Sequence, residues 1–458
     1  MKSDTIAAIA TALSDAGIGI IRISGPEAIA VANRVVVNKK KEHTLKNWQT
    51  HTIHYGFVEE NGTILDEVMV SVMKAPRSYT TEDTVEINCH GGVLLTKRVL
   101  EAVLHAGARM AEPGEFTKRA FLNGRIDLSQ AEAVIDVINA QNEYALKSSV
   151  SQLKGKMSEK VKVLREKIIY EIAYIESALD DPEHISLDGY GEKLAKKLEP
   201  MVKELERLIA SADNGKVMSE GVKTVILGKP NAGKSSLMNV LLGEERAIVT
   251  DIEGTTRDTL EEDIVIGNIL LHLIDTAGIR ETENEIESIG IKKTKESLEK
   301  ADFVIIVLDS SKELSKEDYQ ILDLCKNSTG VVLVNKSDLQ QTLSMQEICN
   351  LSGKDVISFS AAKGDGLDEL ESYIKRQFIE SKIEEKDDLY ITNARQKEAL
   401  VQTKDSLEKV LESIELGMPE DLYAIDLTNA YESLGKIIGE TLEEDIINKI
   451  FKDFCMGK

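Results

Sequence analysis

One stretch of the sequence carries the residue types that bind a chain of phosphates. After the apolar run 222–227, residues 228–235 read GKPNAGKS, which fits G-x-x-x-x-G-K-[ST]. The two glycines allow a tight turn of N–H groups, and the expected helix 236–242 points its positive end at the same anion. Lys234 adds a charge for the β- and γ-phosphates, and Ser235 offers a hydroxyl to Mg²⁺. A glycine-rich turn without a ligand is the alternative, which the complete pattern after a strand disfavours.

Three more short motifs follow, each at the end of an expected strand: DTAG at 275–278, NKSD at 335–338 and SAA at 360–362. A carboxylate at Asp338 can accept two hydrogen bonds from the edge of guanine, which adenine lacks. Each motif is weak singly, but together and in this order the domain resembles the translation-factor-like GTPases. The predicted GTP-binding residues are Asn231, Ala232, Gly233, Lys234, Ser235, Ser236, Thr250, Asp251, Ile252, Glu253, Gly254, Thr255, Thr256, Asp275, Thr276, Ala277, Gly278, Asn335, Lys336, Asp338, Ser360 and Ala361.

The position after DTAG holds Ile279, where Ras-like members carry a glutamine that orients water. The site therefore needs another water-orienting group and another source of positive charge. The carbonyl of Asn231 can bind a monovalent cation such as K⁺ beside the phosphates, although a turn-forming role for Asn231 stays open. The expected ligands are Asn231, Thr250, Ile252 and Thr255 for K⁺, and Ser235 and Thr256 for Mg²⁺.

Composition narrows the class of protein. The 458 residues suggest about three domains, and 42% hydrophobic content is typical of a globular protein. A net charge of −23 argues against a protein that coats nucleic acid by itself. The four cysteines show no C-x-x-C spacing, which favours a reducing cytoplasm over a disulfide framework or zinc site. We expect neither a signal peptide nor a membrane span.

The elements that position these motifs form a multidomain chain. We expect an N-terminal α+β domain, a discontinuous all-α helical domain, and an inserted α/β Ras-like G domain with a mostly parallel sheet. Residues 150–179 carry an apolar stripe that predicts one long helix. We expect the helices after 381 to pack on those of 116–214. The predicted segments are 1–118 (α+β), 119–215 (helical), 216–380 (G domain) and 381–458 (helical).

The whole chain resembles the tRNA-modification GTPase MnmE (TrmE) family. Outside the G domain, the most family-specific stretches are 111–134 and the tail FCMGK, where Met456 is a mild variation. The resemblance implies addition of a (carboxymethyl)aminomethyl group to C5 of the wobble uridine in certain tRNAs, together with the flavoprotein MnmG in a heterotetramer. It also implies a homodimer, K⁺-dependent GTP hydrolysis, and 5-formyl- or methylene-tetrahydrofolate held by the N-terminal domain.

The same resemblance assigns residues by matching motifs. Glu287 matches the glutamate that orients water, within an acidic run that is otherwise a solvated face. Cys455 matches a cysteine of the modification site, although an inert tail cysteine is the ordinary alternative. The residues that match tetrahydrofolate contacts are Arg22, Glu86, Arg125 and Lys458. Without the resemblance, Arg22 and Glu86 would read as ordinary strand-end charges.

Two other functions stay open at this stage. A GTPase switch that binds RNA or assembling ribosomes, like Era and Der, would carry the same G domain without modification chemistry. Such a switch has no use for the folate-contact set or the FCMGK tail, and it would usually carry a basic domain that this chain lacks. A folate-dependent enzyme with a merely regulatory GTPase is the weaker third reading.

Overall fold

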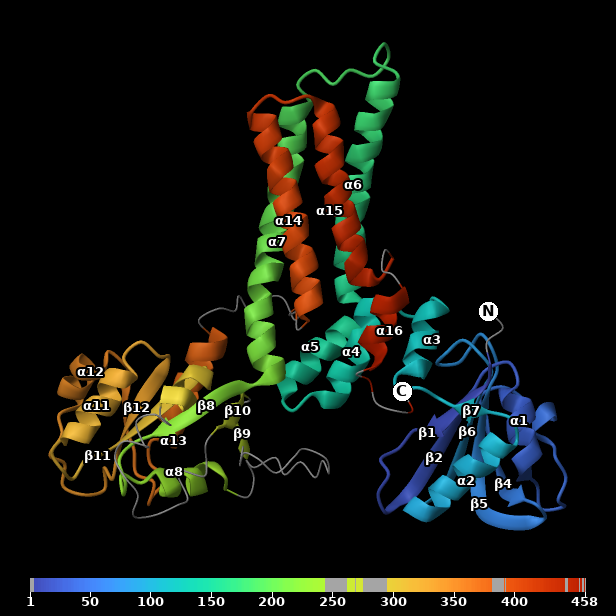
Figure 1. Cartoon of the computed structure of the whole chain (residues 1–458), viewed down its shortest axis with the longest axis horizontal. Helices are drawn as coiled ribbons and strands as arrows, with labels where there is room; N and C mark the ends of the chain where they lie inside the picture. The colour runs from blue at the N-terminus through green and yellow to red at the C-terminus, as the bar shows by residue number, and fades with distance from the viewer. Residues whose placement is uncertain are drawn as a thin grey trace. The chain divides into compact units, whose positions relative to one another are not determined.

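The chain divides into two compact units. The first comprises residues 1–138, 152–198 and 402–458, and the second comprises 139–151 and 199–401. The predicted segment boundaries at 118, 215 and 380 stay predictions. The computed structural model describes residues 4–243, 262–267, 269–274, 295–380, 391, 393–440, 444–452, 454 and 457 (Figure 1).

The first unit contains a seven-stranded sheet within the described residues. Its order is β3-β4-β5-β6-β2-β1-β7, and all neighbours are antiparallel except β1 and β7. Apolar runs and alternation in the sequence predict strands at 18–23, 67–73 and 84–88, which β2, β5 and β6 confirm, whereas β1, β3, β4 and β7 were not predicted. The strands are β1 (Ile6–Ile9), β2 (Ala16–Ser24), β3 (Val36–Val37), β4 (Thr52–Glu60), β5 (Thr63–Met73), β6 (Thr84–Gly91) and β7 (Arg109–Met110).

Alternation along the strands decides which face of this sheet is covered. Ile21 and Ile23 are fully buried on β2, against the apolar sides of α1 (Ala28–Val35) and α2 (Val93–His105). Arg22, between them, belongs to the opposite face. There Phe116 of α3 (Glu115–Leu122) packs on Ile6 and Ala8 of β1, and its ring lies 5.7 Å from the guanidinium of Arg22. Farther from β1, strands β4 and β5 expose side chains on the same face as Arg22.

Helices from both ends of the chain complete the first unit. Helix α15 packs along α6, which confirms for this pair that the late helices pack on the early ones (Figure 1). The guanidinium of Arg165 on α6 lies over the ring of Tyr431 on α15, 4.1 Å from its centroid. These helices are α4 (Leu128–Asn139), α6 (Lys156–Asp180), α15 (Glu420–Ile438) and α16 (Glu444–Lys452), with a 3-10 turn at Leu45–Asn47. Helices α5 (Glu143–Leu153), α7 (Tyr190–Glu220) and α14 (Ala394–Glu415) contribute residues to both units.

The prediction of one helix through 150–179 is wrong. Helix α5 ends at Leu153 and α6 begins at Lys156, because Gly155 adopts a left-handed φ of 87°. The N–H of Gly155 donates to the carbonyl of Gln152 at 2.8 Å, which closes the turn. The apolar stripe continues across the break, with Leu153 and Met157 four residues apart, so periodicity alone does not register it.

The second unit contains a six-stranded sheet within the described residues, in the order β13-β12-β11-β8-β10-β9. All neighbours are parallel except β9 and β10, which pair antiparallel, as the Gly-Asn sequence at 267–268 predicts for a hairpin. The strands are β8 (Val222–Leu227), β9 (Glu262–Ile266), β10 (Ile269–Leu273), β11 (Phe303–Asp309), β12 (Gly330–Asn335) and β13 (Val356–Ser358). The helices are α8 (Lys234–Leu241), α11 (Lys316–Leu324), α12 (Met345–Ser352) and α13 (Leu367–Lys375), followed by a π-helical turn at Arg376–Glu380.

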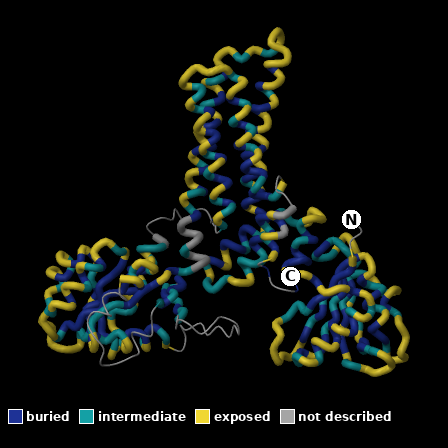
Figure 2. The backbone as a smooth tube through the Cα atoms, in the orientation of Figure 1, coloured by how far each residue is buried: buried dark blue, intermediate teal, exposed yellow. Residues whose placement is uncertain are grey.

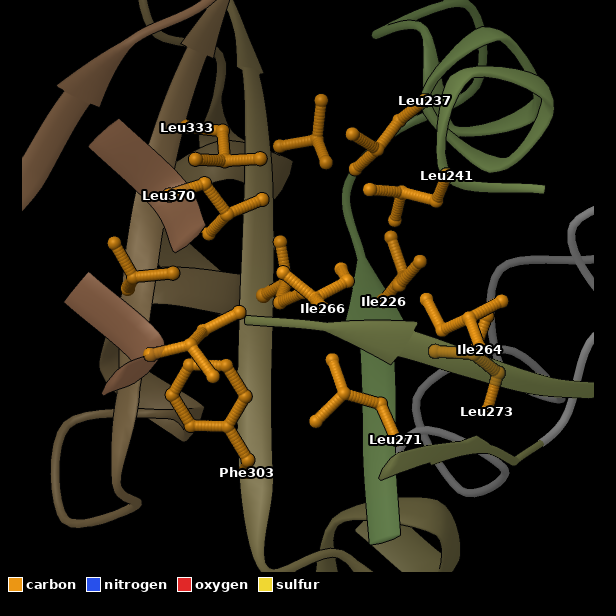
Figure 3. Packing of buried hydrophobic residues seen from close by; sticks show 14 of the residues in the cluster. Ile226, Leu237, Leu241, Ile264, Ile266, Leu271, Leu273, Phe303, Leu333 and Leu370 are labelled. Carbon is orange, nitrogen blue, oxygen red and sulfur yellow. The ribbon is translucent and has the colours of Figure 1, made fainter. Parts of the chain in front are cut away.

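Both faces of this sheet are buried, as parallel βα units require. Strands β11 and β12 are buried along their whole length (Figure 2). One face packs Ile226, Leu237 and Leu241 with Phe303 and Leu370 (Figure 3).

The βα alternation of the sequence predicts strands at 222–227, 263–266, 270–274, 303–308, 331–334 and 356–359, and the observed bounds agree with these to within one residue. It also predicts helices at 289–299, 316–326 and 366–379. Helices α11 and α13 confirm the last two, α12 was missed, and residues 289–294 lie outside the described part.

Candidate functional site

The loop between β8 and α8 is held close to neighbouring strands at its two glycines. Gly228 has a φ of +156°, and a Cβ there would lie 2.4 Å from the carbonyl oxygen of Val307 on β11. Gly233 has a φ of +101° and caps α8, and a Cβ there would lie 2.0 Å from Nδ2 of Asn335. No side chain fits at either position. The sequence therefore folds into a cradle of backbone at the positive end of a helix.

The ammonium of Lys234 lies inside this cradle. Its Nζ donates to the carbonyl oxygens of Gly228 at 2.6 Å and Lys229 at 3.0 Å. Burial lowers the pKa of Lys234, since the charged form loses hydration. A phosphate chain placed in the loop would return a counter-charge to this ammonium, so the cradle fits an anion.

The NKSD motif reaches the same loop from the end of β12. Asn335 donates from Nδ2 to the carbonyl of Ala232 at 2.8 Å, and its Oδ1 accepts from the N–H of Ala361 at 3.0 Å. Lys336 donates from Nζ to the carbonyl of Asn231 at 3.0 Å. Three loops that are far apart in sequence therefore form one edge of the sheet, at the carboxyl ends of β8, β12 and β13.

A cavity of about 470 Å³ opens beside this edge. Asp338 lines it and accepts a hydrogen bond at Oδ1 from the hydroxyl of Ser360 at 2.7 Å. That hydrogen bond holds the pKa of Asp338 below its usual range, so the carboxylate stays ionised and acceptor-only. The cavity is lined by Gly233, Ser236, Asn239, Val240, Asn335, Lys336, Asp338, Leu339, Ala361 and Ala362.

A second group of predicted residues meets on the Arg22 face of the first unit. Arg22 on β2 and Glu86 on β6 are directly paired in the strand register, with Nε and Oε1 2.8 Å apart. Nη1 of Arg22 also donates to the carbonyl of Gly457 at 2.9 Å. The side chains of Arg22 and Glu86 are 18% and 23% exposed, so the pair is screened from water and can still be reached.

Arg125 joins this group through Tyr79. Its guanidinium lies 4.8 Å from the centroid of the Tyr79 ring, and that of Arg22 lies 5.9 Å from the same ring. Nη1 of Arg125 also donates to the carbonyl of Tyr79 at 3.1 Å. Beside them lies a cavity of about 530 Å³ whose lining includes Arg125, Arg77 and His51. This arrangement suits a flat, partly anionic ligand.

Comparisons with known proteins decide the family. A family model described as the MnmE helical domain matches residues 128–455, and one described as the N-terminus of the GTP-binding protein TrmE matches residues 5–125. The chain is 56% identical over 458 residues to the tRNA modification GTPase MnmE of Lachnoclostridium phytofermentans, covering 100% of both chains. The chain belongs to the tRNA modification GTPase MnmE family.

Other members agree over similar lengths. The identity to the MnmE of Streptococcus thermophilus is 46% over 457 residues, which covers 99% of this chain and 98% of that protein. For Thermoanaerobacter pseudethanolicus it is 46% over 462 residues, covering 100% of both chains. A solved G domain of the T. maritima FeoB iron transporter is 26% identical over 35% of this chain and 97% of its own. Its TM-score of 0.26 is too low to support the fold.

Several predicted residues of this MnmE-family chain lie outside the described part. They are Thr250, Asp251, Ile252, Glu253, Gly254, Thr255, Thr256, Asp275, Thr276, Ala277, Gly278, Glu287, Cys455 and Lys458. Among the described residues, no three His, Cys, Asp or Glu side chains gather into a metal site, and no helix is long and apolar enough to cross a membrane.

Sequence reasoning missed the residues that hold the predicted ones in place. Asp309, 3% exposed, accepts from Nζ of Lys336 at 2.7 Å, and Asp318, 1% exposed, accepts from Nζ of Lys229 at 2.6 Å. The signal for Asp318 was present, because Ser315-x-x-Asp318 is a capping-box spacing. Tyr79 was also missed, since nothing in its spacing relates it to Arg22 or Arg125.

Proposed function

We propose that this MnmE-family chain hydrolyses GTP, with K⁺ stimulation, while it modifies C5 of the wobble uridine in certain tRNAs. The product carries a (carboxymethyl)aminomethyl group. One observation carries the proposal: the phosphate loop, NKSD and SAA meet at one edge of the second unit's sheet, around a cavity. The names of the relatives, tRNA modification GTPases at 46% to 56% identity, support the link to tRNA.

Guanine selectivity follows from the ionised Asp338. A carboxylate accepts hydrogen bonds only, and guanine presents two donors on the matching edge. Ala361 also lines the cavity, and its N–H donates to Oδ1 of Asn335 at the rim. Adenine lacks those donors, so the carboxylate of Asp338 would lose both hydrogen bonds with adenine and keep them with guanine.

We propose that two cations complete this site. Mg²⁺ would be held by Ser235 and Thr256, and K⁺ by Asn231, Thr250, Ile252 and Thr255. The cations supply positive charge to the phosphates during hydrolysis. The main-chain carbonyl of Asn231, whose φ is 63°, already accepts from Nζ of Lys336, so its side-chain carbonyl is the oxygen that would bind K⁺. Glu287 would orient the attacking water, in the position that Ile279 cannot serve.

We further propose that the Arg22 face binds 5-formyl- or methylene-tetrahydrofolate as the one-carbon source. Arg22, Arg125 and Lys458 would bind the glutamate carboxylates, and Glu86 would accept from the donor edge of the pterin. The cavity of about 530 Å³ and the aromatic ring of Tyr79 support a ligand that has a flat ring and an anionic tail. Cys455 is proposed to take part in the modification chemistry.

The proposed partners are tRNA, a second copy of the chain and the flavoprotein MnmG, in a cytoplasmic heterotetramer. The open part of the Arg22 face supports the homodimer. There Ile53 is 63% exposed, and Tyr55 and Met69 are directly paired across β4 and β5 while 39% and 44% exposed. A cluster of apolar side chains on an open sheet marks a surface that another protein covers.

Mass spectrometry of tRNA nucleosides tests the function. We expect a strain that lacks the gene to lose the C5-modified wobble uridine, and the wild-type gene to restore it. Lys234→Ala and Cys455→Ser should both fail to restore the modified uridine. The first variant should lose GTP binding, and the second should lose the cysteine that we propose for the modification chemistry. An unchanged nucleoside profile in the deletion strain would overturn the proposal and favour the Era- or Der-like switch.

A further inference from the structure

The second residue of the phosphate loop makes a contact that its motif does not require. Lys229 occupies a variable position of G-x-x-x-x-G-K-[ST], yet its Nζ donates to Oδ2 of Asp318 at 2.6 Å, across 89 positions of sequence. The lysine side chain is 15% exposed and the aspartate 1%. Removing one partner of an ion pair this well shielded leaves a buried charge without its counter-charge and strongly destabilises the local fold. Removing one partner of an exposed pair has little effect.

Asp318 is itself fixed at the start of α11. Its Oδ2 accepts from the N–H of Ser315 at 2.9 Å and from the hydroxyl of Ser315 at 2.8 Å, in a capping box. The positive end of the helix favours the carboxylate. Oδ1 of Asp318 is buried and meets no hydrogen-bond partner among the described residues, whereas Oδ2 contacts the ammonium of Lys229. The aspartate is therefore a rigid anchor.

The main chain of Lys229 in turn positions the ammonium of Lys234. The carbonyl oxygen of Lys229 accepts from Nζ of Lys234 at 3.0 Å and from the N–H of Ala232 at 3.3 Å. The orientation of this one peptide thus sets where the ammonium lies and how the loop turns. On the far side of Pro230, Lys336 holds the carbonyl of Asn231 and is itself bound to Asp309.

We propose that Asp318 is a positioning residue for GTP binding, which acts through Lys229 to hold the phosphate loop in its binding conformation before the nucleotide arrives. Holding the loop in advance removes the ordering cost from the binding step. The inference rests on the proposed GTP binding at this loop. It adds a link between the loop and α11 that lies outside the nucleotide-contact motifs.

The test compares the affinities for GTP and GDP, kcat and KM of the full chain carrying Asp318→Asn or Lys229→Met. We expect each variant to weaken affinity and raise KM about tenfold or more, with kcat changed less. The double variant should be no weaker than the worse single one, because both break one contact. Lys229→Arg keeps the charge and should retain most of the affinity. If Asp318→Asn does not fold, Lys229→Met still decides the matter, since that side chain is partly exposed.

Two matched variants separate positioning from a general weakening of the fold. Glu371→Gln removes a carboxylate of the Lys375–Glu371 pair on α13, away from the loop, and should leave KM unchanged. Leu322→Val trims a buried apolar side chain of the same helix and keeps both Asp318 and its cap, so it should lower the melting temperature while the affinity for GTP stays near the wild-type value. Equal loss of affinity in Leu322→Val and Asp318→Asn would overturn the inference. Unchanged affinity in Asp318→Asn and Lys229→Met, in a chain whose wild type binds GTP, would overturn it alone. A wild type that binds no GTP would overturn the proposed function as well.

Discussion

The phosphate-loop site and the Arg22 face are built in opposite ways. The first is made mostly of backbone, from loops that follow β8, β12 and β13 in one sheet. The second is made of side chains: two paired strands, a ring at Tyr79, Arg125 after α3, and the carbonyl of Gly457. The first kind of site needs short, contiguous motifs, whereas the second needs only that separate residues meet.

This difference has a functional side. A backbone cradle holds the phosphates, which are common to all nucleotides, and leaves discrimination to one or two side chains such as Asp338. On the Arg22 face every contact that we attribute to the ligand comes from a side chain, so both affinity and selectivity should be sensitive to substitution. Substitutions should therefore impair the two sites separately.

The largest effect is expected for Lys234→Ala. Its ammonium lies inside the cradle, and removing it leaves the phosphates without their charge-assisted partner. We expect kcat/KM for GTP to fall by about 100-fold or more, measured as phosphate release. Affinity for 5-formyl-tetrahydrofolate, measured by calorimetry, should not change. Lys223→Ala, on the exposed side of β8, is the control, and a comparable loss there would contradict this assignment.

Asp338→Asn should change which base is accepted. The amide keeps the shape but replaces one acceptor by a donor, so it mismatches guanine and matches the extra carbonyl of xanthine. We expect GTP affinity to fall about 10- to 100-fold, and XTP to be preferred over GTP. Competition between the two nucleotides for the wild type and the variant measures this. A variant that still prefers GTP would show that the cavity beside Asp338 is not the base site.

Arg22→Gln should affect only the other site. It removes a charge that pairs with Glu86 and lies near Tyr79, so we expect about a tenfold loss of affinity for 5-formyl-tetrahydrofolate. GTP hydrolysis by the isolated protein should stay within experimental error. Arg34→Gln removes a guanidinium on α1, on the opposite face of the sheet, and serves as the control. An equal loss of folate affinity in Arg22→Gln and Arg34→Gln would show that the Arg22 face is not the folate site.

The smallest expected effect is on how GTP affinity depends on pH in Ser360→Ala. The hydrogen bond from Ser360 lowers the pKa of Asp338, so the wild-type carboxylate resists protonation as the pH falls. In Ser360→Ala the pKa of Asp338 should rise, so protonation of the carboxylate begins at a higher pH than in the wild type. The ratio of variant to wild-type Kd for GTP should therefore grow as the pH falls from 7 to 4. Circular dichroism at each pH checks that the chain stays folded, and a constant ratio would contradict the role of Ser360.

The same contrast explains how far the sequence could be read. Strand β8 was predicted to the residue, because a β-branched apolar run borders a phosphate-binding motif. Strand β4 was missed, since its His, Thr and Gly residues hide the alternation that places Val58 in the core. The break at Gly155 was missed because the apolar spacing continues through it.

Predicted site residues follow the same rule. NKSD and SAA could be read locally, and the structure brings them to the phosphate loop. The roles of Asp309 and Asp318 could not be predicted from local sequence. Each depends on the lysine that the aspartate contacts, and the packing of β11 and α11 against the loop decides which lysine that is. Arg22 and Arg125 were found only through the family resemblance, since no local pattern links them to Tyr79.

The discontinuity of the first unit has a consequence for biosynthesis. Helix α6 finds its packing partner, α15, only after the whole of residues 199–401 has left the ribosome. At about 5 to 20 residues per second, that interval lasts roughly 10 to 40 s. The second unit's later segment has no such gap within it and can fold while the apolar side of α6 still waits. A nascent chain of this protein therefore exposes, for that time, a surface on which chaperones act.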